Sequence, residues 1–259
     1  MTIVIGQAFV GGVLVGADTL VIRSDGSSTE GTKVTPISGP SGEFIFGNAS
    51  DDLDATRTMA NRIFRFLGEN ISGLVNLEDG VSSIMTEWAA AFRDKPPASE
   101  LVLAVKLVGD TAKLYRCAPP NTFLEISEGY VAAGAGSGVT DPLHDSLMMA
   151  GLNTLPIVLK RFSYLMYRAK KDNALCGKRT GCYIIKNAED GPLQVNILDL
   201  LRAEKFADQM DFLLQTTSAF YLGGAPEDVE KNAQSIAGFI NTFKSFRTAT
   251  FHDSLGREL

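Results

Sequence analysis

Thr2 is the residue whose chemistry is easiest to identify, because it directly follows the initiator methionine. Removal of Met1 would leave a threonine with a hydroxyl nucleophile and a free α-amino group on the same residue. The ordinary pKa of an α-amino group is about 7.7–8.0, so near neutral pH this group can accept the hydroxyl proton. Thr2 is therefore a candidate nucleophile that carries its own base, although Met-Thr also begins many proteins without such chemistry.

The composition argues against several other classes of function. The only histidines are His144 and His252, and the three cysteines, Cys117, Cys176 and Cys182, include no Cys-x-x-Cys spacing. We therefore expect no metal site, no cofactor, no disulfide framework and no Ser-His-Asp centre. The net charge of −6 argues against a nucleic-acid partner, and no apolar run is long enough to span a membrane. We expect a soluble, cytoplasmic protein.

Thr2 lies at the mouth of an expected β-hairpin, whose apolar strands cover residues 4–10 and 13–15 with Gly11 and Gly12 as the turn. Residues 24–32 are expected to form a polar loop. Further strands are expected at residues 33–37, 43–46, 101–108, 112–116, 122–126, 130–133, 181–186 and 193–198. Helices are expected at residues 51–67, 77–92, 141–150, 155–170, 199–220 and 227–246. Two sheets packed on each other, with pairs of helices outside, satisfy this order.

Four short motifs follow one another within the first 51 residues. Thr2 comes first, residues 12–18 read Gly-Val-Leu-Val-Gly-Ala-Asp, residues 33–37 read Lys-Val-Thr-Pro-Ile, and residues 46–51 read Phe-Gly-Asn-Ala-Ser-Asp. In this order the motifs resemble the β-type subunits of the proteasome family, within the N-terminal nucleophile hydrolases. The order of helices and strands follows the same family to about residue 198.

The resemblance implies a role for each matching residue. Thr2 Oγ would attack a peptide carbonyl, while the Thr2 amine takes the hydroxyl proton and delivers it to the leaving amine. Lys33 would be a fixed positive charge beside the nucleophile, paired with Asp18 because a buried ammonium needs a partner. Gly47 would donate its backbone N–H to the developing oxyanion.

The small-residue loop after the strand at 130–133 can match the family in two ways. With residues 134–136 as the family's Gly-Ser-Gly, Ala135 replaces the serine that supports the threonine amine; with residues 136–138, Ser137 keeps it. The loop also has the context of a phosphate-binding turn, but no P-loop lysine follows it.

Other positions depart from the family's pattern. Leu20 stands where the family usually has arginine, and the family's Asp-x-x-Ser-Gly aligns with residues 173–177, with Asp172 adjacent. Asn173 thereby takes the place of the aspartate, and Cys176 replaces the serine with a weaker hydrogen-bonding group. These changes imply slow activity or an unusual substrate.

By the same alignment, the pocket for the side chain before the scissile bond has an uncharged lining, so an apolar side chain is expected there. The residues concerned are Val21, Gly31 or Thr32, Thr35, Ile45 and Ala49.

The resemblance implies an α+β fold, the four-layer αββα sandwich of N-terminal nucleophile hydrolases, over residues 1–198, with residues 199–259 as a helical C-terminal extension packed on the same domain. It implies a threonine-type endopeptidase that acts on peptides or unfolded proteins, in a homo-oligomeric ring with an unfolding or gating partner. Two alternatives stay open. One is a catalytically inactive ring or scaffold subunit, and the other is an N-terminal nucleophile transpeptidase or small-amide hydrolase.

Overall fold

The computed structural model contains two five-stranded antiparallel sheets and a separate two-stranded ribbon. It describes residues 2–22, 26–118, 122–127, 129–148, 153–221, 244 and 250–259. The first sheet has the order β10-β1-β2-β11-β12, formed by Tyr130–Gly134, Ile3–Phe9, Gly12–Asp18, Thr180–Lys186 and Leu193–Gln194. The second sheet has the order β5-β6-β7-β8-β9, formed by Val34–Gly39, Gly42–Ser50, Ser99–Leu107, Lys113–Ala118 and Thr122–Glu125. The ribbon pairs β3 (Leu20–Ile22) with β4 (Ser28–Glu30).

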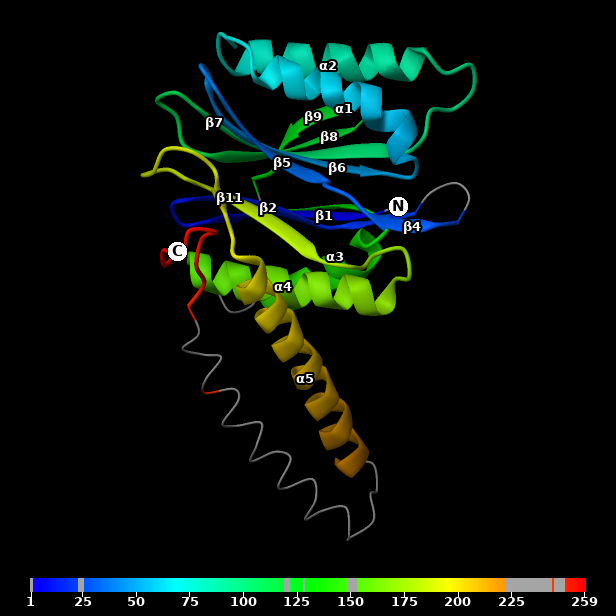
Figure 1. The fold of residues 1–259 in the computed structure, drawn as a ribbon, viewed down its shortest axis with the longest axis vertical. Coiled ribbons are helices and arrows are strands. Elements are labelled where there is room, and N and C mark those ends of the chain that lie inside the picture. The colour runs from blue at the N-terminus through cyan, green and yellow to red at the C-terminus, as the bar shows by residue number, and fades with distance from the viewer. Residues whose placement is uncertain are drawn as a thin grey trace.

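The helices lie on the outer faces of the sheets (Figure 1). Helices α1 (Leu53–Leu67) and α2 (Leu74–Ala90) share a hydrophobic core with the second sheet. Helices α3 (Ser137–Met148) and α4 (Leu155–Asp172) cover the first sheet, and a third core fills the space between the two sheets. The expected mixture of helices and antiparallel sheets is thus confirmed. Among the helices in the described ranges, none is both long and apolar enough to cross a membrane.

The β1–β2 hairpin lies in the middle of the molecule, and both of its faces are buried. Ile3 and Ile5 of β1 pack toward α4, while Val4 packs toward the second sheet. Gly11 in the turn has a φ of +98°, a conformation that glycine adopts without strain. Val4 pairs with Ala17 in the hairpin, so the start of the chain lies beside the end of β2. The hairpin therefore brings Thr2 next to Asp18.

Two expected elements before α4 differ from the structure. The helix expected at 141–150 begins instead at Ser137, because Val139 N and Thr140 N both bond to Gly136 O and form the first turn. Within the polar loop expected at 24–32, Ser28–Glu30 forms β4 by pairing with β3.

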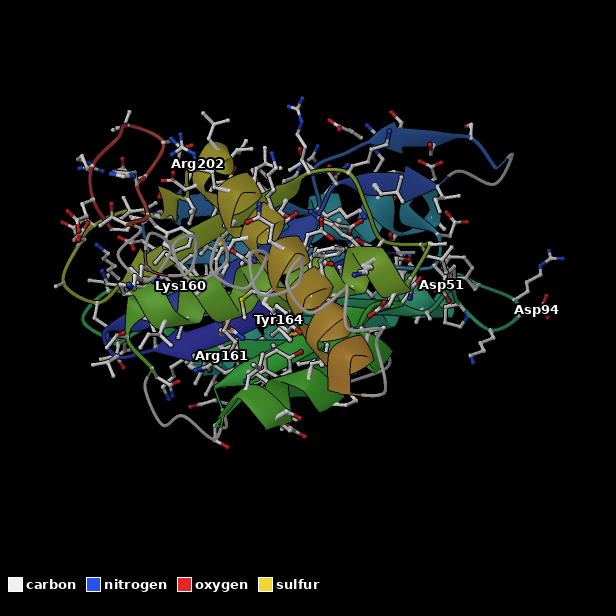
Figure 2. All side chains as sticks on the ribbon, turned by 90° about the horizontal axis from the view of Figure 1, so that it is seen from below. Asp51, Asp94, Lys160, Arg161, Tyr164 and Arg202 are labelled. Atoms are coloured by element: carbon white, nitrogen blue, oxygen red, sulfur yellow. The ribbon has the colours of Figure 1, made fainter. Side chains whose placement is uncertain are left out.

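The C-terminal part also differs from the expectation. The strand expected at 193–198 is limited to β12, because Asn196 Oδ1 accepts a hydrogen bond from Leu198 N and starts helix α5 (Ile197–Tyr221). Helix α5 packs on α4 (Figures 1 and 2) and extends away from the sheets (Figure 1). The helix expected at 227–246 lies outside the described residues, apart from Lys244. The last ten residues return to the body, where Phe251 joins the core of the first sheet.

Candidate active site

Asp18, the last residue of β2, is the centre of a buried polar cluster. Its Oδ1 accepts hydrogen bonds from Thr2 Oγ1 (2.6 Å), Ile3 N (3.0 Å) and Lys33 Nζ (2.8 Å). Thr2 and Asp18 have no exposed surface. The Thr2 hydroxyl and the Lys33 ammonium, which come from two separate segments, therefore donate to the same carboxylate oxygen of Asp18.

Lys33 reaches this cluster from just before β5. Its ammonium donates to Asp18 Oδ1 and to Leu20 O, and the residue is buried. Burial lowers the pKa of Lys33 below its ordinary value of 10.5, while the ion pair with Asp18 acts in the opposite direction. Leu20 thus contributes its backbone carbonyl at the position where proteasome β-type subunits usually have an arginine.

Residues 173–180, called the 173–180 loop below, comprise the connection that follows α4 and Thr180, the first residue of β11, and they close the other side of Asp18. Gly177 N donates to Asp18 Oδ2 at 3.0 Å, and Asn173 Nδ2 donates to Ala135 O at 2.7 Å. Cys176 is buried between them, and burial, assisted by the charge of Asp18, raises the pKa of its thiol to about 12. Cys176 is therefore a neutral thiol at neutral pH.

Ser137 and Asp172 lie at different distances from this cluster. Ser137 Oγ donates to Gly134 O at 2.8 Å, and a Cβ at Gly134 would meet Thr2 O, so Ser137 holds backbone that touches Thr2. Asp172 forms an i,i+4 ion pair with Arg168 on the surface of α4. Asn173, and not Asp172, is the residue that connects the two loops beside Asp18.

Gly47 does not offer its N–H to this site, which corrects its expected role as oxyanion donor. Asn48 N donates to Lys33 O at 3.0 Å. Because successive N–H groups of a strand point to opposite sides, the Gly47 N–H points toward β7. A Cβ at Gly47 would meet Val4 at 2.6 Å and Val15 at 3.3 Å. Glycine is needed here for close packing between the sheets.

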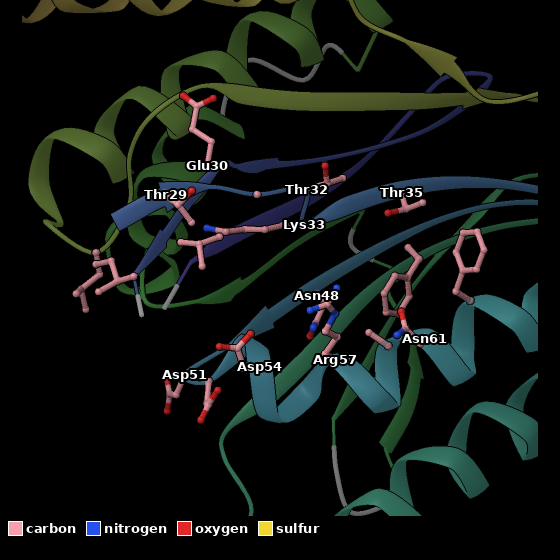
Figure 3. Close-up of a pocket in the computed structure, with 18 residues that line it drawn as sticks. Thr29, Glu30, Thr32, Lys33, Thr35, Asn48, Asp51, Asp54, Arg57 and Asn61 are labelled. Carbon is pink, nitrogen blue, oxygen red and sulfur yellow. The ribbon is translucent and has the colours of Figure 1, made fainter. Parts of the chain in front are cut away.

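An open pocket of about 940 Å³ lies beside Lys33, between the β3–β4 ribbon and α1 (Figure 3). Val21 and Thr35 are among its lining residues, as are Gly31 and Thr32. Ile45 and Ala49 are not.

Ile45 and Ala49 instead belong to the core between the sheets, so their assignment to the pocket is corrected. The side chains of β6 alternate between its two faces, and Phe46 and Asn48 are the ones that reach the pocket.

Helix α1 supplies pocket residues that the sequence analysis missed. Arg57, Ala60, Asn61 and Phe64 line the pocket, and their spacing of three and four places them on one face of the helix. That spacing was the available signal, but residues 51–67 were interpreted only as a helix. Four carboxylates also belong to the lining: Glu30, Asp51, Asp52 and Asp54. The pocket is therefore not lined by uncharged side chains alone.

Comparison with known proteins adds a likeness in fold. No family model matches the sequence, and no curated protein sequence matches it. Anbu (ancestral beta-subunit) from Yersinia bercovieri has a TM-score of 0.69 at 12% identity, with 86% of this chain and 98% of that chain covered. The helical assembly of the Anbu complex from Pseudomonas aeruginosa gives 0.69 at 12% identity, with 88% and 99% covered. An Anbu (Gly-1) mutant from Hyphomicrobium sp. strain MC1 gives 0.66 at 14% identity, with 84% and 97% covered.

These comparisons correct the family inferred from the motifs. The four motifs within residues 2–51 were attributed to proteasome β-type subunits. However, no family model matches the sequence, and these similar structures are Anbu proteins. The motifs describe a hairpin turn, a buried lysine and a closely packed glycine, and these features do not by themselves distinguish one family within the fold. At 12–14% identity, the likeness to the Anbu proteins concerns the fold alone.

Proposed function

We propose that this chain, once Met1 is removed, is an N-terminal threonine hydrolase that cleaves peptide bonds. The observation that carries the proposal is the 2.6 Å hydrogen bond between Thr2 Oγ1 and Asp18 Oδ1, because the same oxygen accepts the Lys33 ammonium. Burying a charged pair costs stability even when its members are hydrogen-bonded, and such clusters occur often at functional sites. Here Lys33, one member of the cluster, also lines an open pocket.

In the proposed reaction the freed Thr2 amine accepts the hydroxyl proton while Oγ1 attacks the carbonyl carbon of the scissile bond. The tetrahedral intermediate collapses to an ester on Thr2, and the amine gives its proton to the leaving nitrogen. Water then adds to the ester carbonyl and loses a proton to the same amine. Collapse of the second intermediate releases a carboxylic acid and returns the proton to Oγ1.

Lys33 and Asp18 have supporting roles in this reaction. The Lys33 ammonium favours the developing negative charge on Oγ1, and Asp18 fixes both Lys33 and the Thr2 side chain. Ser137 supports the backbone beside Thr2. Gly47 has no role in the proposed reaction, because its N–H points away from Thr2.

The pocket beside Lys33 is proposed to receive the side chain before the scissile bond. Its lining combines the apolar Val21 and Phe46 with Thr35 and the Arg57 guanidinium. We therefore expect a side chain with an apolar stem and a polar end to be preferred over a purely aliphatic one. A panel of fluorogenic peptides that differ only at this position tests the preference, and the best cleavage after valine or leucine would contradict it.

We also propose that the stacked sheets and their outer helices form the four-layer αββα sandwich of N-terminal nucleophile hydrolases over residues 1–198, with residues 199–259 as an extension. Copies of the chain are proposed to assemble, since a similar structure is described as a helical assembly. Electron microscopy would distinguish a helical assembly from a closed ring. A monomer at all concentrations in size-exclusion chromatography would contradict assembly. An unfolding or gating partner stays a prediction.

The intact mass of the full chain tests the proposed reaction. The mass is measured before and after treatment with an epoxyketone, which requires both the hydroxyl and the free amine of an N-terminal threonine. We expect loss of Met1 and one adduct, with no adduct on Thr2→Ala.

A catalytically silent subunit is the second candidate, because Thr2 is fully buried and its hydroxyl is bonded to Asp18. Retention of Met1 together with no adduct on the wild-type chain would reject the hydrolase and support this candidate.

A further inference from the structure

Glu204 on α5 belongs to a mostly buried polar cluster on the far side of β11 from the pocket. Lys170 Nζ donates to Glu204 Oε1 at 2.9 Å and to Oε2 at 2.8 Å, and also to Thr180 Oγ1 at 2.5 Å. The Thr180 hydroxyl in turn donates to Glu204 Oε1. The side chains of Lys170 and Glu204 are each 12% exposed, so this ion pair is shielded from solvent far more than a surface pair.

Thr180 connects this cluster to the candidate active site. It is the residue of β11 that pairs with Asp18 of β2. Immediately before it, Thr19 N donates to Arg179 O at 2.9 Å, and Arg179 N donates to Thr19 Oγ1 at 3.0 Å. Gly177 N reaches the Asp18 carboxylate itself. The 173–180 loop is thus bonded to Asp18 on one side and to α4 and α5 on the other.

The backbone of this loop is strained at Lys178. Lys178 has a φ of 62° and is the one non-glycine residue with positive φ within the described ranges. The left-handed conformation costs roughly 1–2 kcal/mol for a residue with a side chain. Such a conformation persists only where the surroundings hold the backbone in place. The hydrogen bonds at Gly177, Arg179 and Thr180, on either side of Lys178, are contacts that can do so.

We infer that Glu204 is a positioning residue for Asp18, and that it acts through Thr180 and the 173–180 loop. It fixes the loop whose Gly177 N–H orients the Asp18 carboxylate toward Thr2 and Lys33. The inference rests on the proposed function. Its consequence is that α5, which crosses α4 at the edge of the fold (Figures 1 and 2), contributes to the chemistry and does not merely extend the chain.

The neighbouring carboxylates of α5 make contacts of a different kind. Asp208 Oδ1 accepts from Tyr167 Oη at 2.8 Å, and Asp211 pairs with Lys171 at 3.1 Å. These contacts join α5 to the side chains of α4, whereas Glu204 also bonds to Thr180 in the sheet. Asp208 therefore provides a matched control, because Asp208→Asn removes one carboxylate charge from the same helix without touching the loop.

The test compares Glu204→Gln and Asp208→Asn in the full chain. Epoxyketone modification is followed by intact mass to obtain the inactivation rate constant (kinact), the half-saturating concentration (KI) and the final adduct stoichiometry. Removing a partner that orients a metal ligand typically lowers activity by about 10–100-fold, and by analogy we expect kinact to fall by about tenfold in Glu204→Gln. KI should not change, because α5 does not line the pocket. Asp208→Asn should keep both values.

Thr180→Val gives a second, independent variant should Glu204→Gln fail to fold. Valine keeps the shape and the β-branching of threonine but cannot bond to Lys170 or Glu204. We expect a similar fall in kinact. Amide hydrogen exchange across residues 173–180 should be faster in both variants than in Asp208→Asn, because the loop loses its support.

Each result either supports or rejects the inference. Unchanged kinact in folded Thr180→Val rejects it, and so does an equal fall in Asp208→Asn. A reduced final stoichiometry with normal kinact also rejects it, because that pattern reports unfolded protein and not a displaced Asp18. Absence of any adduct on the wild-type chain rejects the proposed function itself. A wild-type chain and variants that all react at the same rate reject only the role of Glu204, so the two failures are distinguishable.

Discussion

The two sides of Lys33 differ in the burial of their residues and in the kind of group that each side contributes. On the Asp18 side, a single carboxylate accepts hydrogen bonds from Thr2, Lys33 and three backbone N–H groups, and every partner is buried or half-buried. On the pocket side, Arg57 and Asp54 are exposed side chains on one helix face. The first arrangement depends on backbone geometry, whereas the second depends on exchangeable side chains. The proposed chemistry should therefore tolerate little change, while the proposed specificity should be easy to alter.

Asp18→Ala should have the largest effect, because it leaves the buried Lys33 ammonium without its counter-ion. Breaking a buried pair from one side costs roughly 3–5 kcal/mol of the free energy of unfolding. Adduct formation at Thr2 should also be lost. Denaturant unfolding and intact mass measure the two effects. Asp54→Ala, which removes an exposed carboxylate from the pocket side, should change stability by less than about 0.5 kcal/mol. Similar losses in both variants would remove the distinction between the two sides.

Lys33→Met should destabilise less than Asp18→Ala, because Thr2 and the backbone N–H groups still bond to the Asp18 carboxylate. We expect a loss of about 2 kcal/mol, the scale of a hydrogen bond to a charged group. Burial lowers the Lys33 pKa in the folded chain, so the unfolded chain holds this proton more tightly. Wild-type stability should therefore rise relative to Lys33→Met as the pH increases toward the ordinary lysine pKa of 10.5. Urea unfolding measures the gap, and a constant gap would contradict the lowered pKa.

Ile45→Val and Thr35→Val probe the two faces of the second sheet. Ile45 lies in the core between the sheets, and removing one methylene there should cost about 0.5–1.5 kcal/mol without altering peptide preference. Thr35 lines the pocket, so Thr35→Val should change stability by less than about 0.5 kcal/mol while altering the preference. Thermal unfolding and the peptide panel separate the effects, and the reverse pattern would place Ile45 in the pocket.

Lys178→Gly should have the smallest effect and the opposite sign. Glycine removes the strain of the left-handed conformation but raises the entropy of the unfolded chain, so we expect a net gain of about 0.5 kcal/mol. The same substitution at Lys205, an exposed position within α5, should cost about 1 kcal/mol. A loss of stability at both positions, measured by denaturant unfolding, would show that the Lys178 backbone is not strained.

Prediction from sequence succeeded where the signal is local and failed where one residue of register decides the outcome. The β1–β2 hairpin was expected because two apolar runs flank Gly11 and Gly12. The expected roles of Gly47 and Ile45 depend instead on which way alternate residues of β6 point. A shift of one residue reverses every N–H and every side chain of a strand. Spacing along the chain alone cannot resolve that choice.

The amino-acid sequence by itself determined the order of most helices and strands and the place of Thr2 at the start of a buried hairpin. Hydrophobic periodicity and glycine turns act within a few residues, so these features are readable without the fold. Only the tertiary structure decided that Gly177 would bond to Asp18, 159 positions away along the chain, and that Glu204 would reach the sheet through Thr180. Such contacts depend on how distant elements pack, because hydrogen bonds form only within about 3 Å and no pattern in the chain encodes that distance.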